Sequence, residues 1–134
     1  MNINIPLLFT RLLLGLILFW QGFGKVFTWG FDNVYKSFEA YQDTFLPTFI
    51  LKFSAYFTTY GELIFGLLLI LGLFRKYTYL GIALILLIVA FGHGLQSPIW
   101  DLQHVFIRSV FLIFLMMLPL EKDTYALDSY FKNK

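Results

Sequence analysis

The chain has no cysteine and few charged residues. None of its 134 residues is Cys, and only 13% are Asp, Glu, Lys or Arg. Without thiols the chain cannot carry out the cysteine chemistry of membrane-bound disulfide oxidoreductases, so that class of enzyme is excluded. The net charge of +2 is too small to indicate a nucleic-acid-binding protein, so we expect no nucleic-acid partner.

Hydrophobic residues make up most of the chain. Their share is 59%, and the mean hydropathy of +0.74 exceeds that of a typical soluble domain. Four stretches are close to the length of about 20 apolar residues that a spanning helix needs. These stretches are 5–27, 49–74, 77–95 and 103–120. Because each run is continuously apolar rather than alternating, helices are favoured over the strands of a membrane barrel.

These stretches predict an all-α fold, a multi-pass bundle of four transmembrane helices in a single domain over 1–134. The first stretch has no Lys or Arg before it and no small-residue cleavage site after it, so we expect it to be retained. The connection 28–48 carries apolar residues at helical spacing, among them Phe31, Val34 and Phe38. It is predicted to be an amphipathic outer segment that lies in the membrane interface or covers the bundle.

Basic residues are unevenly distributed between the two sides of this bundle. Four spans place both termini and the turn between the second and third spans on one side of the membrane. That side carries Arg75, Lys76, Lys122, Lys132 and Lys134. The other side has Lys36, with Lys25 and Lys52 at nearby helix ends. The excess of positive charge predicts that both termini are cytoplasmic.

Glu62 lies inside the second predicted span. A carboxylate at this depth costs roughly 2.5–3.5 kcal/mol on insertion scales, so it needs an internal partner. Arg11 shares one stripe of the first span with Gly15 and Gly22, and such a stripe of small and charged residues should face the bundle. We therefore predict an intramembrane pair between Glu62 and Arg11, with Arg108 as the alternative partner. The pair could be purely structural, and Arg11 could instead extend toward the interface.

A second polar group is predicted near the outer ends of the helices. Its members are Lys25, His93, Asp101, His104 and Arg108. We predict that they surround an outward-opening pocket, in which Asp101 orients His104 and the cations hold an anion or a quinone carbonyl. In the alternative, Lys25 extends to the interface and only Asp101, His104 and Arg108 interact.

No metal site is expected, because no further ligand cluster accompanies the two histidines. Haem ligation by His93 and His104 is disfavoured, since the short loop between them leaves little room for a macrocycle. No residue is assigned a catalytic role.

Two motifs in the first two spans resemble those of a known family. The first span reads RLLLG from Arg11 and GFGK from Gly22, and the second reads ELIFGLLLILGLFR from Glu62 to Arg75. These motifs are similar to those of the DoxX family of small bacterial membrane proteins. The resemblance implies a four-helix domain in the bacterial cytoplasmic membrane. The family's name comes from a subunit of a thiosulfate:quinone oxidoreductase, and other members are linked to redox-stress complexes, which implies a redox-associated role.

Three functions remain open at this stage. The first is an accessory, redox-associated subunit that handles a quinone or a sulfur oxyanion, with Glu62 relaying a proton. Any enzymatic activity would then belong to a quinone-linked oxidoreductase complex. The second is a non-enzymatic subunit that anchors or stabilises partners. The third, transport of a small solute, has less support because the chain shows no broken-helix repeats. We favour the first, with the lipid bilayer and other membrane or extracytoplasmic subunits as partners.

Overall fold

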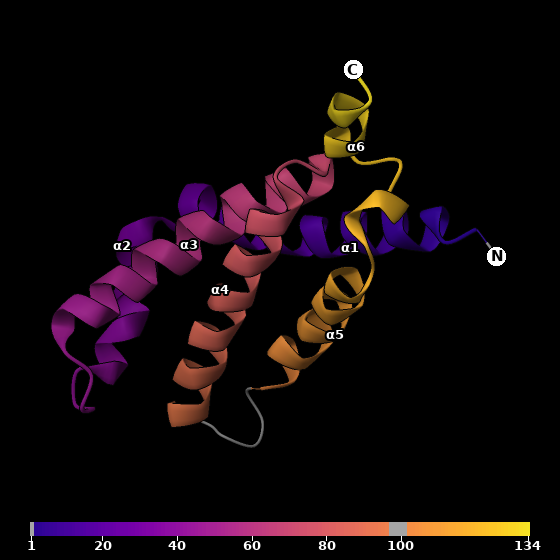
Figure 1. Cartoon of the computed structure of the whole chain (residues 1–134). Helices are drawn as coiled ribbons and strands as arrows, with labels where there is room; N and C mark the ends of the chain where they lie inside the picture. Colours follow the sequence, from indigo (N-terminus) through magenta and orange to yellow (C-terminus); the bar gives the residue numbers. More distant parts are fainter. Residues whose placement is uncertain (1, 97–101) are drawn as a thin grey trace.

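The computed structural model describes residues 2–96 and 102–134, which form helices and no strand (Figure 1). The long helices are α1 (Asn4–Phe23), α3 (Thr48–Leu71), α4 (Arg75–Gln96) and α5 (Gln103–Met117). α1 continues as a π-helical segment, η1 (Gly24–Trp29). By length and composition, α1 with η1, α3 and α4 can each cross a membrane. The prediction of a membrane protein built from helices is therefore confirmed.

The fourth predicted span, 103–120, is shorter in the structure than in the prediction. α5 has 15 residues and ends at Met117, because Leu118 is extended before Pro119. A helix of this length rises about 22 Å, which is less than the hydrocarbon thickness of about 30 Å. Helix length alone thus supports three spans and leaves the predicted fourth unconfirmed.

The ends of α3 follow from its sequence. Pro47 is extended and immediately precedes the helix, which begins at Thr48. At the other end Gly72 has a φ of 71°, a left-handed conformation that glycine adopts without steric cost. The amide of Leu73 donates to the carbonyl of Leu68 at 3.0 Å, which completes a common type of helix ending. The chain then turns sharply into α4.

The connection between the first two long helices forms a cap, residues 31–46, over one end of the molecule. It consists of α2 (Phe31–Ser37), the 3-10 turn η2 (Phe38–Tyr41) and a loop that leads to Pro47. Val34 of α2 is the buried residue of this helix. Phe31 stacks on Tyr56 of α3 with 4.1 Å between the ring centroids. The cap is thus fixed to α3 by apolar contacts.

The tail after α5 folds back over the opposite end. It contains the 3-10 turn η3 (Leu120–Lys122) and α6 (Leu127–Lys132). Figure 1 shows α6 beside the turn between α3 and α4, far from α2. The amide of Asp128 donates to the carbonyl of Gly72 at 3.1 Å, which joins the tail to that turn.

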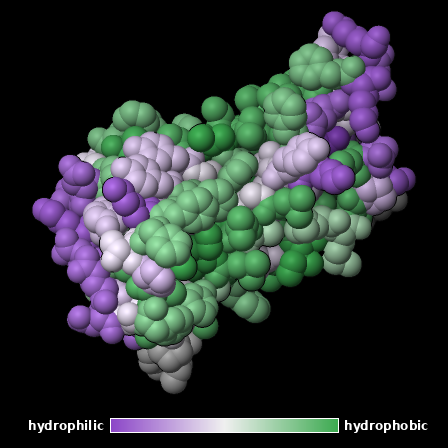
Figure 2. Space-filling view, turned by 60° about the vertical axis from the view of Figure 1, so that its left-hand side comes forward, coloured by the Kyte–Doolittle hydropathy of each residue, from purple (hydrophilic) through white to green (hydrophobic). Residues whose placement is uncertain are grey.

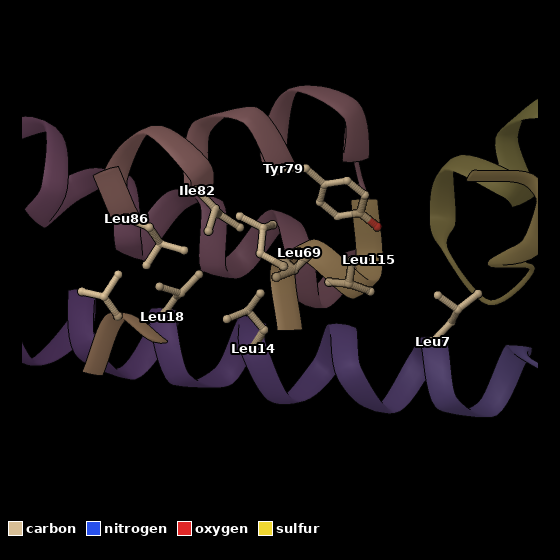
Figure 3. Packing of buried hydrophobic residues seen from close by; sticks show 10 residues of the cluster. Leu7, Leu14, Leu18, Leu69, Tyr79, Ile82, Leu86 and Leu115 are labelled. Carbon is tan, nitrogen blue, oxygen red and sulfur yellow. The ribbon is translucent and has the colours of Figure 1, made fainter. Parts of the chain in front are cut away.

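One apolar core joins the four long helices. Leu14 and Leu18 of α1 point toward Leu69 of α3 and Ile82 of α4, with Leu115 of α5 beside them (Figure 3). All five are at most 1% exposed. In water, burying each such side chain stabilises the fold by about 1.5–3 kcal/mol. In lipid this hydrophobic contribution is largely absent, and van der Waals packing between the helices takes its place.

The outside of the helices is apolar as well. Figure 2 shows a broad hydrophobic band between two hydrophilic ends. Trp20, Leu80 and Leu87 are among the large apolar side chains that are more than half exposed. An apolar surface of this extent is not typical of a soluble monomer and suits contact with lipid chains.

α1 and α3 are held at close range by glycines. A Cβ atom added to Gly66 would lie 2.5 Å from the backbone nitrogen of Phe19, and one added to Gly22 would collide with the backbone of Leu63. Only glycine allows the two backbones to approach so closely. These contacts fix the antiparallel register of the two helices and therefore decide which polar side chains meet.

Candidate functional site

A cavity of about 610 Å³ lies between the cap and helices α1, α3 and α4. We call it the cap pocket. Its walls are mainly apolar and include Val34 and Phe38 of the cap, Leu51 of α3 and Val89 of α4. Its polar lining comes from Gln21, Lys25, Ser37, Tyr41, Ser54, Thr58, Glu62, His93 and Gln96. Apolar walls with a few convergent polar groups are typical of a site for a small organic ligand.

An ion pair between Lys25 and Glu62 lines this pocket. The Lys25 Nζ atom donates to Glu62 Oε2 at 2.7 Å. The Glu62 side chain is only 1% exposed, whereas that of Lys25 is 23% exposed. Lys25 lies in the π-helical segment η1, whose wider turn changes the direction in which its side chain leaves the helix. The pocket therefore contains a positive and a negative group in direct contact.

The predicted pair between Glu62 and Arg11 is wrong. Since α1 and α3 are antiparallel, the contact of Gly22 with Leu63 brings the turn of Lys25, not that of Arg11, beside Glu62. Arg11 lies 14 residues before Lys25, a rise of about 21 Å along the helix. The prediction that the Glu62 side chain faces the interior of the bundle agrees with its burial.

Arg11 instead binds the tail and the end of α3. Its Nε donates to Asp123 Oδ2 at 2.9 Å, and its Nη1 donates to the carbonyls of Leu69 and Ile70 at 2.8 and 2.7 Å. The side chain is 1% exposed. Arg11 is therefore buried, and its charge is matched inside the protein.

Arg75 completes this arrangement from the start of α4. Its guanidinium lies 3.5 Å from Asp123 Oδ2 and 3.4 Å from Asp128 Oδ2, and it donates to the carbonyl of Leu120 at 2.8 Å. We call Arg11, Arg75, Asp123 and Asp128 the turn–tail network. Sequence reasoning missed it, although the acidic residues on the side predicted for Arg11 all lie in the tail.

The predicted outer cluster is only partly assembled. Lys25 and His93 both line the cap pocket, whereas Arg108 of α5 does not. Arg108 is half-buried and attracts Glu62 electrostatically, but it forms no ion pair with Glu62 in the described part of the chain. Asp101 lies outside the described residues, and His104 lies in the first turn of α5 with a side chain that the structure does not describe. The pocket faces the cap and α4 rather than α5.

Two buried acceptors near the ion pair are unsatisfied. Gln21 Oε1 and Thr59 Oγ1 have no hydrogen-bond partner within 2–96 and 102–134. An unsatisfied buried polar atom costs about 1–3 kcal/mol, so a donor on a bound molecule would be stabilised by Gln21, whereas Thr59 does not line the pocket. Gln21 lines the pocket, and its acceptor extends the polar lining beyond Lys25 and Glu62.

Comparison with known proteins identifies the family. The DoxX family model matches residues 6–94. The chain belongs to the DoxX family. No curated protein and no solved structure matches it. The DoxX match covers most of α1, all of the cap and α3, and nearly all of α4, so it includes Lys25, Glu62 and His93. The carboxylates of the turn–tail network lie beyond it.

Proposed function

We propose that this DoxX-family protein is an accessory membrane subunit of a redox complex, and that its cap pocket binds the headgroup of a quinone. The observation that carries the proposal is the Lys25–Glu62 ion pair in an otherwise mainly apolar cavity. A volume of about 610 Å³ lies within the range of roughly 300–1,000 Å³ that small-molecule sites occupy.

The polar groups suit both redox forms of such a ring. The Lys25 ammonium can donate a charge-assisted hydrogen bond to a quinone carbonyl. Gln21 Oε1 and the Glu62 carboxylate can accept from a quinol hydroxyl. Reduction of a quinone takes up protons as well as electrons. In this proposal a partner subunit supplies the electrons, and Glu62 relays a proton.

Access from the bilayer also fits a quinone. Leu87 and Phe91 of α4 border the pocket and are 67% and 53% exposed on the outer surface of the helix. A ligand with an isoprenoid chain could enter between them and leave its chain among the lipids. The apolar wall would then contact the ring, and Trp29 would lie close to it.

Quinone binding is tested with the purified chain and a short-chain quinone. We expect quenching of tryptophan fluorescence, because Trp29 lines the pocket. Lys25→Met should weaken binding about tenfold or more, since it removes a charged donor worth about 1.5–3 kcal/mol. Lys52→Gln is the control, because Lys52 is exposed and lies outside the pocket.

Two results would contradict quinone binding. One is equal affinity in the Lys25→Met and Lys52→Gln proteins, and the other is no quenching in the wild type. A protein without quinone that co-purifies with stoichiometric partners would favour the alternative, an anchoring or stabilising subunit.

We further propose that the chain spans the bacterial inner membrane four times, with the cap in the outer interface and both termini in the cytoplasm. The support is that Arg75, Lys76 and the basic tail lie at one end of the molecule and the cap at the other. α5 is short for a span, and a locally thinner bilayer or the apolar residues 118–120 would compensate.

This orientation is tested with single cysteines, which the natural chain lacks. Asn2→Cys, Gln42→Cys, Lys76→Cys and Asn133→Cys place one thiol in each region of interest. A membrane-impermeant maleimide added to intact cells should label only the Gln42→Cys protein. Labelling of the other three and not of Gln42→Cys would reverse the orientation.

A further inference from the structure

A second groove lies at the end of the molecule opposite the cap. It has a volume of about 370 Å³ and is open to the surface. It lies where α4 begins and α6 packs, and its wall includes Lys76, Tyr77, Phe131 and Lys132. The two lysines come from segments far apart in sequence, and the fold brings them to one groove.

The groove carries positive charge that the protein does not neutralise. Lys76 and Lys132 form no ion pair with any residue of 2–96 or 102–134. The one carboxylate in the wall, that of Asp128, already accepts from the amides of Phe74 and Arg75 at 3.0 Å and from Arg75 Nε at 3.4 Å. Arg75 is itself only 3% exposed and is paired within the turn–tail network. Two exposed cations therefore remain available to an external anion.

The turn–tail network also joins the two segments that form the groove when no ligand is bound. Asp128 ties α6 to the first residues of α4, and Ser129 Oγ accepts from Arg75 Nη2 at 3.2 Å. Lys76 directly follows Arg75, and Lys132 lies one turn after Ser129 on α6. A site whose backbone is already fixed loses little conformational freedom when it binds.

An apolar track leads from the groove along α4. Its residues share one helical face and are 47–68% exposed: Tyr77, Leu80, Leu84, Leu87 and Phe91. From Tyr77 to Leu87 the helix rises about 15 Å, which is half of a hydrocarbon core of about 30 Å and therefore about the depth of one leaflet. Phe74 and Phe131, 62% and 60% exposed, add aromatic surface at the groove, as is common at the membrane–water interface.

We propose that this groove binds one anionic phospholipid. Its phosphate lies between Lys76 and Lys132, and one acyl chain follows the track on α4. Charge complementarity selects the anionic headgroup, and the track distinguishes a lipid from free phosphate, which would use the lysines alone. The inference does not rest on quinone binding, although Leu87 and Phe91 border both the track and the cap pocket.

The test is native mass spectrometry of the full chain in detergent, titrated with phosphatidylglycerol, phosphatidylcholine or inorganic phosphate. We expect one tightly bound phosphatidylglycerol, preferred about tenfold or more over phosphatidylcholine. The reason is that each lysine near the headgroup attracts the negative charge of the lipid and so increases its affinity. Lys76→Gln with Lys132→Gln should abolish the preference, and Lys76→Arg with Lys132→Arg should keep it. The matched control, Lys122→Gln with Lys134→Gln, removes the same charge from the tail outside the groove.

Three results would overturn the proposal. Equal retention of both lipids by the wild type excludes a specific site. An equal loss in the control protein means that diffuse positive charge binds the lipid. Displacement of the lipid by millimolar inorganic phosphate means that the groove is a free-phosphate site. If the protein with both Lys76→Gln and Lys132→Gln fails to fold, two measurements on the wild type decide the question. They are its preference for phosphatidylglycerol and the retention of that lipid in inorganic phosphate.

Discussion

Replacing Asp123 with alanine is expected to destabilise the protein by about 3–5 kcal/mol, the usual cost of removing one partner from a buried ion pair. Asp123 contacts both Arg11 and Arg75, and all three side chains are at most 3% exposed. Without the carboxylate, two guanidinium groups remain buried with only carbonyl, hydroxyl and Asp128 contacts. Thermal unfolding in detergent measures the effect, and limited proteolysis should show early cleavage between η3 and α6.

Glu121→Ala provides the matched control for Asp123→Ala. Glu121 is an exposed carboxylate in the same tail and belongs to no ion pair of the described residues. Its loss should change stability by no more than about 0.5 kcal/mol. Replacing Arg11 and Asp123 together by apolar residues should recover part of the loss, because only Arg75 then lacks the Asp123 carboxylate and it keeps Asp128. Identical melting of the Asp123→Ala and Glu121→Ala proteins would show that the network does not hold the tail.

Adding a methyl group at Gly66 is expected to separate α1 from α3. The new Cβ of Gly66→Ala would lie 2.5 Å from the nitrogen and 2.8 Å from the Cα of Phe19, and backbone atoms cannot move aside as a flexible side chain can. Overpacking of this kind costs up to about 3 kcal/mol. The shift should also weaken the Lys25–Glu62 contact, because the register of the two helices sets it. The melting temperature of the Gly66→Ala protein should fall. Once a ligand of the cap pocket is known, the affinity of the protein for that ligand should fall as well.

Gly94→Ala is the matched control for Gly66→Ala, because the added methyl group there meets no neighbouring backbone. Nothing lies within 4 Å of the added Cβ, and Gly94 is inside α4. Alanine is about 1 kcal/mol more favourable than glycine in a helix, so this protein should be unchanged or slightly more stable. If Gly66→Ala behaves like Gly94→Ala, the α1–α3 contact is looser than the structure describes.

The sequence predicted the helices well because hydrophobic length is a local property. The runs that became α1, α3 and α4 are visible without any knowledge of neighbours, and Pro47 and Gly72 mark the two ends of α3. The family assignment also came from contiguous motifs, and the match over residues 6–94 confirms it. α5 ended earlier than predicted, since Pro119 stops the helix before the apolar run is complete.

The partners of the charged residues could not be predicted with the same success. The sequence indicated that Glu62 is buried, but the stripe of Arg11, Gly15 and Gly22 suggested an arginine as its partner instead of Lys25. Its true partner depends on the register of α1 against α3, which the close contact at Gly22 sets. Asp123 was missed for a related reason, because a short polar tail carries no local sign that it folds back onto the helices.

The ion pair between Arg11 and Asp123 also has a consequence for biosynthesis. The two residues are 112 positions apart, so Asp123 is synthesised only after α1, α3, α4 and α5. Until then Arg11 lacks its contacts with the tail and keeps only the carbonyls of Leu69 and Ile70 as partners. This end of α1 therefore gains its last contacts only when the tail folds back, and a chain truncated before Asp123 would leave the buried Arg11 without its carboxylate partner.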